Sequence, residues 1–222
     1  MSTAAAPVDP AAPRAPRITA TGPWSEDELD PQYPDIDGVE LAAGSIRLPE
    51  ARMLSILRSR LSDCELEVDP SVPIEVQDCE LTGVDLTGHR ITGLHRVRLE
   101  RCRLGGADLG DARVRDVELR DCVLDLSVWR AARLERVALL GGRVDGMELD
   151  GAQLGDVTVA DVRLAEVSLD GVRAERVDLT GADVSEVRDV VALRGCTISI
   201  AQTVALAARS ARALGVQVRA EA

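Results

Sequence analysis

The chain has 222 residues, 45% of them hydrophobic, which is enough to bury one sizeable core with a small appendage. Its formal net charge of −12 at pH 7 argues against direct contact with nucleic acid, because phosphate binding requires cations. The sequence has no apolar run long enough for a membrane span, and its start lacks a basic segment followed by an apolar stretch, so we expect a cytoplasmic protein without membrane contact.

Residues 1–45 are predicted to form a disordered N-terminal extension. Ala and Pro dominate residues 1–23, and residues 24–40 carry seven carboxylates and no basic residue. Trp24, Tyr33 and Ile36 could dock on the folded core or on a partner, although a solvated tail is the simpler interpretation.

Residues 46–73 are predicted to form an N-terminal helical cap and lead-in. The helical pattern opens at Pro49, and its apolar residues fall on one face: Met53, Leu54, Leu57 and Leu61. Such a face would shield the first unit of a repeat array.

A five-residue repeat dominates residues 74–198. From Leu99 to Val184 every fifth residue is apolar, and all but Trp129 and Ala174 are Leu or Val. A period of five fits neither a helix nor a flat strand. It fits a chain that turns a corner every five residues, so that four sides make a coil of about 20 residues and the coils stack as parallel β-strands.

The repeat changes frame twice. An earlier frame begins at Val76 and ends at Ile91, and we expect it to slip through Leu94. A second slip falls between Val184 and Leu193.

These pentads resemble the consensus Ala-(Asp/Asn)-Leu-x-x of the pentapeptide-repeat family. Nearly intact copies are Ala107-Asp108-Leu109-Gly110-Asp111 and Ala182-Asp183-Val184. The resemblance implies an all-β fold, a right-handed quadrilateral parallel β-helix, to which we add short N- and C-terminal α-helical caps. Many relatives place Phe at the large inward position, whereas this chain has no Phe and must fill its core with Leu and Val.

Residues 199–222 are predicted to form a C-terminal cap. Ser199 and Gln202 make a capping box, Gly215 ends the helix, and residues 216–218 could add a short strand. The segment 198–208 is similar to the tail of the mycobacterial fluoroquinolone-resistance members of the family, which implies a homodimer through this cap. The candidate dimerisation residues are Val204, Ala207, Ala208, Ala211 and Leu214.

Three features of the interior can be predicted from the register. Cys102 and Cys122 stack on neighbouring coils, where a disulfide is conceivable, but free buried thiols are the favoured interpretation. Trp129 occupies a Leu position, and we expect it to point inward because Ser127 beside it is small. Ala174 is small for its position and is predicted to leave a void.

The sequence gives little support for catalysis. His89 and His95 are the only histidines, no Cys/His cluster has the spacing of metal ligands, and no Gly-rich phosphate motif is present. A regular convex rod also lacks the water-excluding pocket that paired carboxylates need for acid–base work. We therefore predict no enzyme activity, no catalytic residue, no cofactor and no metal.

The outward charges sort by face, because residues 20 apart stack in one column. One face, which we call the acidic face, sets five carboxylates against Arg130: Asp108, Asp111, Glu148, Asp150 and Asp170. On another face one column alternates Asp116, Arg136, Asp156 and Arg176. Such a column most simply fixes the register of the coils, and a binding role is the alternative.

Together these features predict a non-enzymatic protein-binding or scaffold rod whose partner the sequence does not name. The alternative is a DNA-mimicking modulator or protector of DNA gyrase or another type II topoisomerase, acting through the acidic face. Some family members act in this way, so the alternative rests on the resemblance.

Overall fold

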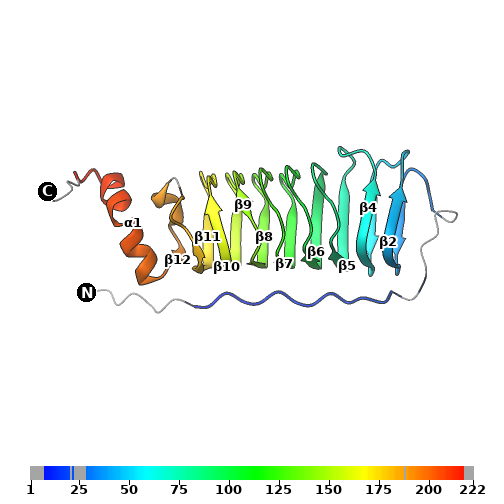
Figure 1. The fold of residues 1–222 in the computed structure, drawn as a ribbon, viewed down its shortest axis with the longest axis horizontal. Helices are drawn as coiled ribbons and strands as arrows, with labels where there is room; N and C mark the ends of the chain where they lie inside the picture. Colours follow the sequence, from blue (N-terminus) through cyan, green and yellow to red (C-terminus); the bar gives the residue numbers. More distant parts are fainter. Residues whose placement is uncertain (1–7, 21, 23–28, 188, 218–222) are drawn as a thin grey trace.

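The computed structural model describes residues 8–20, 22, 29–187 and 189–217. Within these residues the chain winds into a parallel β-solenoid of about eight coils, followed by one helix (Figure 1). The strands pair in parallel in the order β1-β3-β5-β6-β7-β8-β10-β11-β12, so each coil lies on the one before it.

The elements follow one another along the chain with short turns between them. The strands are β1 (Asp35–Asp37), β2 (Glu40–Arg47), β3 (Leu54–Leu57), β4 (Arg60–Glu67), β5 (Ile74–Thr82), β6 (Ile91–Glu100), β7 (Arg113–Arg120), β8 (Arg133–Leu140), β9 (Val144–Asp145), β10 (Gln153–Ala165), β11 (Arg173–Asp183) and β12 (Cys196–Thr197). The helices are a 3-10 helix, η1 (Val190–Leu193), and α1 (Ile200–Ala213).

The five-residue repeat produces four sides per coil, as predicted. Leu134 on β8 pairs with Leu154 on β10, and Leu154 pairs with Ala174 on β11, a step of 20 residues each time. Many corners place a non-glycine residue in the left-handed region, such as Asp116 at φ 56° and Asp121 at φ 50°. Each such corner costs about 1–2 kcal/mol, which the continuous apolar core and the parallel ladder must offset.

The predicted frame slip at Leu94 is confirmed. Val76 on β5 pairs with Leu94 on β6, so this coil has 18 residues, and a register shift lies between Ile74 and Glu75. Near the end, Val177 pairs with Cys196, a step of 19 residues.

The predicted N-terminal helical cap is wrong. Residues 46–73 include β3 and β4, which pair in parallel with the strands before and after them, and the solenoid begins at β1 rather than at residue 74. Leu54 and Ile56 both point into the core, which a helix could not achieve two residues apart. Arg58 and Asp63 lie at left-handed corners that would break a helix.

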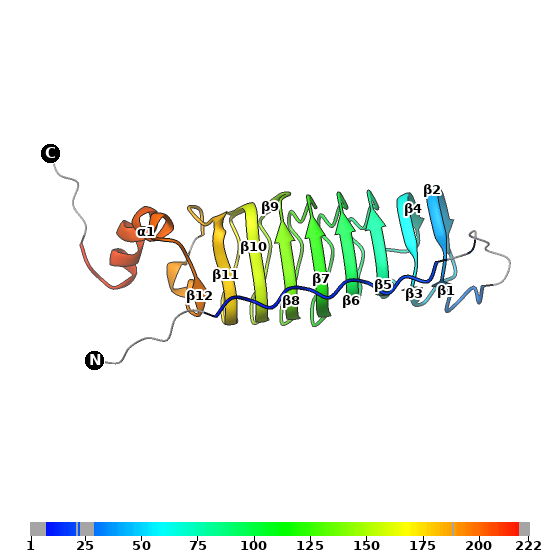
Figure 2. The same cartoon turned by 90° about the horizontal axis from the view of Figure 1, so that it is seen from below.

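The described part of the N-terminal extension also differs from the predicted disordered tail. Residues 8–20, coloured dark blue in Figures 1 and 2, run along the whole row of coils from β11 back to β3. Ile36 is fully buried in the first coil, Tyr33 is exposed, and Trp24 lies outside the described residues.

Trp129 points inward, as predicted, and is only 1% exposed. Its indole Nε1 donates a hydrogen bond to Ser127 Oγ at 2.9 Å, and Ser127 Oγ donates to the carbonyl of Leu124 at 2.7 Å. The small residue beside the ring therefore supplies both space and the hydrogen-bond acceptor that a buried indole needs.

Candidate functional site

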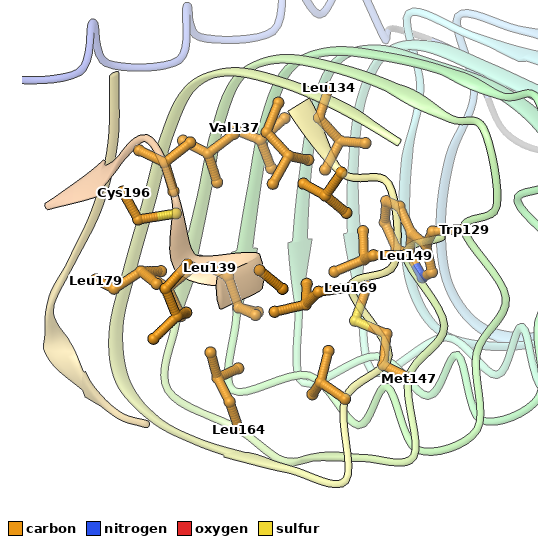
Figure 3. Close-up of a pocket in the computed structure, with 18 of the residues that line it drawn as sticks. Trp129, Leu134, Val137, Leu139, Met147, Leu149, Leu164, Leu169, Leu179 and Cys196 are labelled. Carbon is orange, nitrogen blue, oxygen red and sulfur yellow. The ribbon is translucent and has the colours of Figure 1, made fainter. Parts of the chain in front are cut away.

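The interior holds an apolar cavity of about 80 Å³ in the C-terminal half of the solenoid (Figure 3). Its lining is almost entirely apolar and includes Trp129, Leu149 and Leu169. Ala174, where a void was predicted, is not one of them. Among the described residues the Cys196 thiol is the one weakly polar group that faces this space, so the cavity offers little to orient or activate a substrate.

No group of three or more His, Cys, Asp and Glu in the described part of the chain could hold a metal ion. His89 is buried, with Nδ1 3.1 Å from the carbonyl oxygen of Thr87 and Nε2 without a hydrogen-bond partner. The second histidine, His95, has Nε2 2.9 Å from Nη1 of Arg96, and burial lowers the pKa of His95. In the described ranges, no helix has the length and apolar character needed to cross a membrane.

The five cysteines are free thiols. Burial raises the pKa of Cys79 to about 12 and that of Cys196 to about 11. A thiol with such a pKa is almost fully protonated at neutral pH, so these two are poor nucleophiles.

The acidic face lies on the side of the coils that carries Leu109, Trp129 and Leu149. Bridges stack Asp108, Val128 and Glu148 as one column of neighbouring coils. By strand spacing, Asp108 and Glu148 are then about 10 Å apart along the rod, and Asp150 and Asp170 about 5 Å apart. The structure therefore brings the five predicted residues onto one side, with Asp111 at its corner.

Arginine neutralises the acidic face only in part. Arg130 Nη2 lies 2.5 Å from Glu148 Oε2, and among the described residues this is the one ion pair that involves the five carboxylates. Asp108 accepts a hydrogen bond from the backbone N–H of Gly110 at 2.9 Å, while Asp150 accepts from Ser168 Oγ at 2.5 Å. Asp108, Asp111, Asp150 and Asp170 thus form no ion pair among the described residues, although Arg90 on the neighbouring coil forms a β-bridge with Asp108.

The C-terminal helix α1 is fixed to the last coils by its first turn. Ser199 and Gln202 form the predicted capping box, with Gln202 N–H donating to Ser199 Oγ at 3.2 Å. Gln202 Nε2 also donates to the carbonyls of Leu179 at 2.7 Å and Ala182 at 2.6 Å. One side chain therefore caps both the helix and the solenoid. Gly215 ends the helix at φ 79°, as predicted.

The predicted dimerisation residues lie away from the solenoid. Leu206 is the buried residue of α1, whereas Val204 is 72% and Leu214 81% exposed. Ala207 and Ala208 are exposed and Ala211 is half-buried. The apolar face thus remains uncovered within the described chain. No strand is assigned to residues 216 and 217, and residue 218 lies outside the described residues.

The alternating column is longer than the sequence predicted. It forms one corner of seven successive coils, and we call it the ladder: Arg58, Asp78, Arg96, Asp116, Arg136, Asp156 and Arg176. The 18-residue coil lies between Asp78 and Arg96, so it displaces Arg58 and Asp78 from a strict 20-residue count. Every member of the ladder is in the left-handed region.

Each ladder aspartate is held by the arginine of the next coil. Arg136 donates to Asp116 through Nε at 2.6 Å and Nη2 at 2.9 Å, and Arg176 binds Asp156 at the same two distances. Arg176 lowers the pKa of Asp156 to about 2. Burial acts to raise the pKa of Asp78, but the hydrogen bonds from Arg96, Arg17 and Gln77 together outweigh it, and the pKa falls to about 2.

The N-terminal segment 8–20, which we call the strap, lies on the ladder (Figure 2). Its backbone N–H groups donate to the three aspartates in turn: Ala11 to Asp156 Oδ1 at 3.1 Å, Arg14 to Asp116 Oδ1 at 3.1 Å, and Arg17 to Asp78 Oδ1 at 3.0 Å. Sequence reasoning missed this contact. The available signal was the recurrence of proline at positions 10, 13 and 16, each directly before a donating residue.

A five-residue repeat folded into four-sided coils of parallel strands defines the pentapeptide-repeat class of β-solenoids. The chain shows both features over most of its length and therefore has the fold of this class.

Comparisons with known proteins give the fold and no more. No family model matches the chain, and no curated protein matches it. Similar solved structures include a trypsin-treated variant of QnrB1, a plasmid-mediated fluoroquinolone resistance protein (13% identity, TM-score 0.42, 89% of this chain and 96% of that one). They also include the pentapeptide-repeat protein Rfr23 from the cyanobacterium Cyanothece 51142 (19% identity, TM-score 0.24, 64% of this chain and 86% of that one). At these values the likeness carries no argument about partner or activity.

Proposed function

We propose that the protein is a non-enzymatic binding module, a rod that holds a protein partner along its acidic face. The observation that carries this proposal is that four of the five carboxylates on this face form no ion pair within the described chain. Elsewhere on the rod arginines pair with carboxylates one coil away, as Arg60 does with Glu80 at 3.0 Å. Like charges at coil spacing repel each other, and a basic surface of a partner would relieve that repulsion.

The proposed partner is a protein with clustered Arg or Lys, because the same charges disfavour nucleic acid. No membrane contact is part of the proposal. We place the module in the cytoplasm, since its thiols are free and buried.

The test is a matched pair of charge reversals. Asp108→Lys, Glu148→Lys and Asp170→Lys alter the acidic face, and Asp145→Lys, Asp178→Lys and Asp183→Lys make the same charge change on other sides. A partner captured by the wild type and the control set, and lost with the acidic-face set, supports the proposal. Equal loss with both sets would show that only bulk charge matters.

The second candidate is DNA mimicry directed at gyrase or another type II topoisomerase. It is favoured by the fixed spacing of the carboxylates along a narrow rod, since a duplex presents negative charge to its enzymes in repeating rows. Supercoiling by purified gyrase, titrated with the protein, tests it. If the protein at micromolar concentration neither inhibits gyrase nor protects it from the drug, DNA mimicry is removed as a candidate and the first proposal still stands.

We further propose a homodimer through α1. Ile200, Val204 and Leu214 are exposed, and with Ala207 and Ala211 they recur at alternating steps of four and three residues. This spacing forms one apolar stripe that a second copy of the helix could cover.

A further inference from the structure

The strap and the ladder have matching periods. Acceptor oxygens recur on every second coil of the ladder, about 9.6 Å apart by strand spacing. Donating N–H groups recur on every third residue of the strap, and three residues of polyproline II advance about 9.3 Å. From Asp156 to Asp78 the ladder spans four coil steps, or about 19 Å, and the six residues from Ala11 to Arg17 span nearly the same length.

Proline occupies the positions of the strap that face the solenoid. Pro10, Pro13 and Pro16 are half-buried against the solenoid, whereas Ala11, Arg14 and Arg17 are exposed. Pro13 and Pro16 lie in a small groove with Val97 and Glu118. Proline also fixes φ near the polyproline II value, so the segment loses little freedom when it docks.

The ladder is formed without help from the strap. Each aspartate keeps two arginine hydrogen bonds from the next coil, and its backbone is fixed by parallel pairing on both sides. Removing the strap would take away one N–H donor from each aspartate and uncover Val97, Arg98 and Glu118 on the solenoid. No residue of the strap is fully buried, so its hold on the ladder consists of a few backbone bonds and proline contacts.

We propose that the ladder is a binding site for polyproline II segments of other proteins that carry proline at every third residue, and that the strap is its built-in competitor. The site contacts backbone N–H groups and proline rings, while the side chains of the three donating residues, Ala11, Arg14 and Arg17, are exposed. Any segment with the same proline spacing therefore presents the same features. The ladder is separate from the acidic face, so this site and the proposed function stand or fall independently.

The test uses the full chain with its own strap weakened by Pro10→Gly, Pro13→Gly and Pro16→Gly. A fluorescent peptide of residues 7–20, PVDPAAPRAPRITA, is titrated against this variant and the wild type, and binding is followed by anisotropy. The control peptide carries one extra Ala after Arg14, which keeps the charge and puts the second half out of phase. We expect the in-phase peptide to bind the variant at least tenfold more tightly than it binds the wild type. On the variant, it should also bind at least tenfold more tightly than the control peptide.

Equal binding of the two peptides would overturn the proposal, because charge alone would then suffice. Absence of binding to the folded variant at millimolar peptide would also overturn it and leave the strap a purely internal contact. If the variant does not fold, hydrogen exchange of the wild type decides: excess in-phase peptide must accelerate exchange at Ala11, Arg14 and Arg17, and no acceleration refutes the site. A wild-type dimer that the three glycines convert to a monomer would assign the groove to the strap of a second copy, against the proposal.

Discussion

Removing one arginine from the middle of the ladder should cost far more stability than removing one from another corner. In Arg136→Ala the carboxylate of Asp116, whose side chain is 2% exposed, loses both bonds from a side chain that is itself 12% exposed. Breaking a buried pair from one side costs about 3–5 kcal/mol. Since water can enter the space that Arg136 leaves, we take the lower value, about 3 kcal/mol.

The matched control is Arg101→Ala. Arg101 is also a left-handed corner residue, at φ 52° against 54° for Arg136, so the backbone cost of alanine cancels. Its pair with Glu100 is on the surface, with side chains 59% and 38% exposed, and is worth about 0–1 kcal/mol. The two variants should therefore differ by about 2–3 kcal/mol, or about 4–12 °C in Tm for a chain of this size.

Urea unfolding at pH 7, followed by far-UV circular dichroism, measures the difference. A second arm adds Asp116→Asn to Arg136→Ala, which removes the buried charge and tolerates the left-handed corner. This double variant should recover part of the loss. A gap below about 1 kcal/mol between the two arginine variants, or no recovery with asparagine, would refute the view that the ladder is a row of buried, mutually dependent ion pairs.

Three further predictions concern other parts of the molecule. Ser127→Ala leaves the indole N–H of Trp129 unpaired and should lower the free energy of unfolding in urea by about 1–3 kcal/mol. Trp129→Phe should then lower it less in the Ser127→Ala background than in the wild type. Val204→Glu with Leu214→Glu should convert a dimer to a monomer in light scattering without lowering Tm, and a lowered Tm would mean that these residues pack within the monomer. For pH, two ladder aspartates have folded pKa values of about 2, below the ordinary value of about 3.9, so their contribution is complete above about pH 4 and is lost as the pH falls towards 2. Hydrogen exchange should therefore show the strap amides losing protection over that interval, after correction for the intrinsic rate, and unchanged protection would separate the strap from the ladder charges.

The five-residue repeat alone predicted the fold, and this repeat continues on the N-terminal side of residue 74. Ile36, Ile46, Ile56 and Leu66 continue the frame of Val76 backwards in steps of ten. Leu54, Leu57 and Leu61 also fit a helical face, and over so short a stretch the two periods compete. Parallel pairing with neighbours on both sides decides between them, and local spacing does not contain that information.

The candidate site was predictable only where the period is regular. The acidic face lies wholly within 20-residue coils, so counting placed its five residues on one side. The ladder crosses the 18-residue coil, and counting therefore found Asp116 to Arg176 but not Asp78. The strap could not be placed from composition, because a proline-rich segment without a visible docking site has the signature of disorder. Its order depends on acceptors more than a hundred residues away.

The strap reverses the usual relation between synthesis and assembly. In a stacked array each coil contacts its neighbours, so coils can form as the chain emerges. Ala11 is made before all of the coils, yet its acceptor on Asp156 lies 145 residues later in the chain. The bond from Ala11 must therefore wait until the coil that carries Asp156 exists, whereas Arg17 can bond Asp78 four coils earlier. Complete docking then links the coil of Asp78 to the coil of Asp156, four steps away, and couples the stability of coils that otherwise contact only their neighbours. A chain truncated before Asp156 would lack the bond of Ala11.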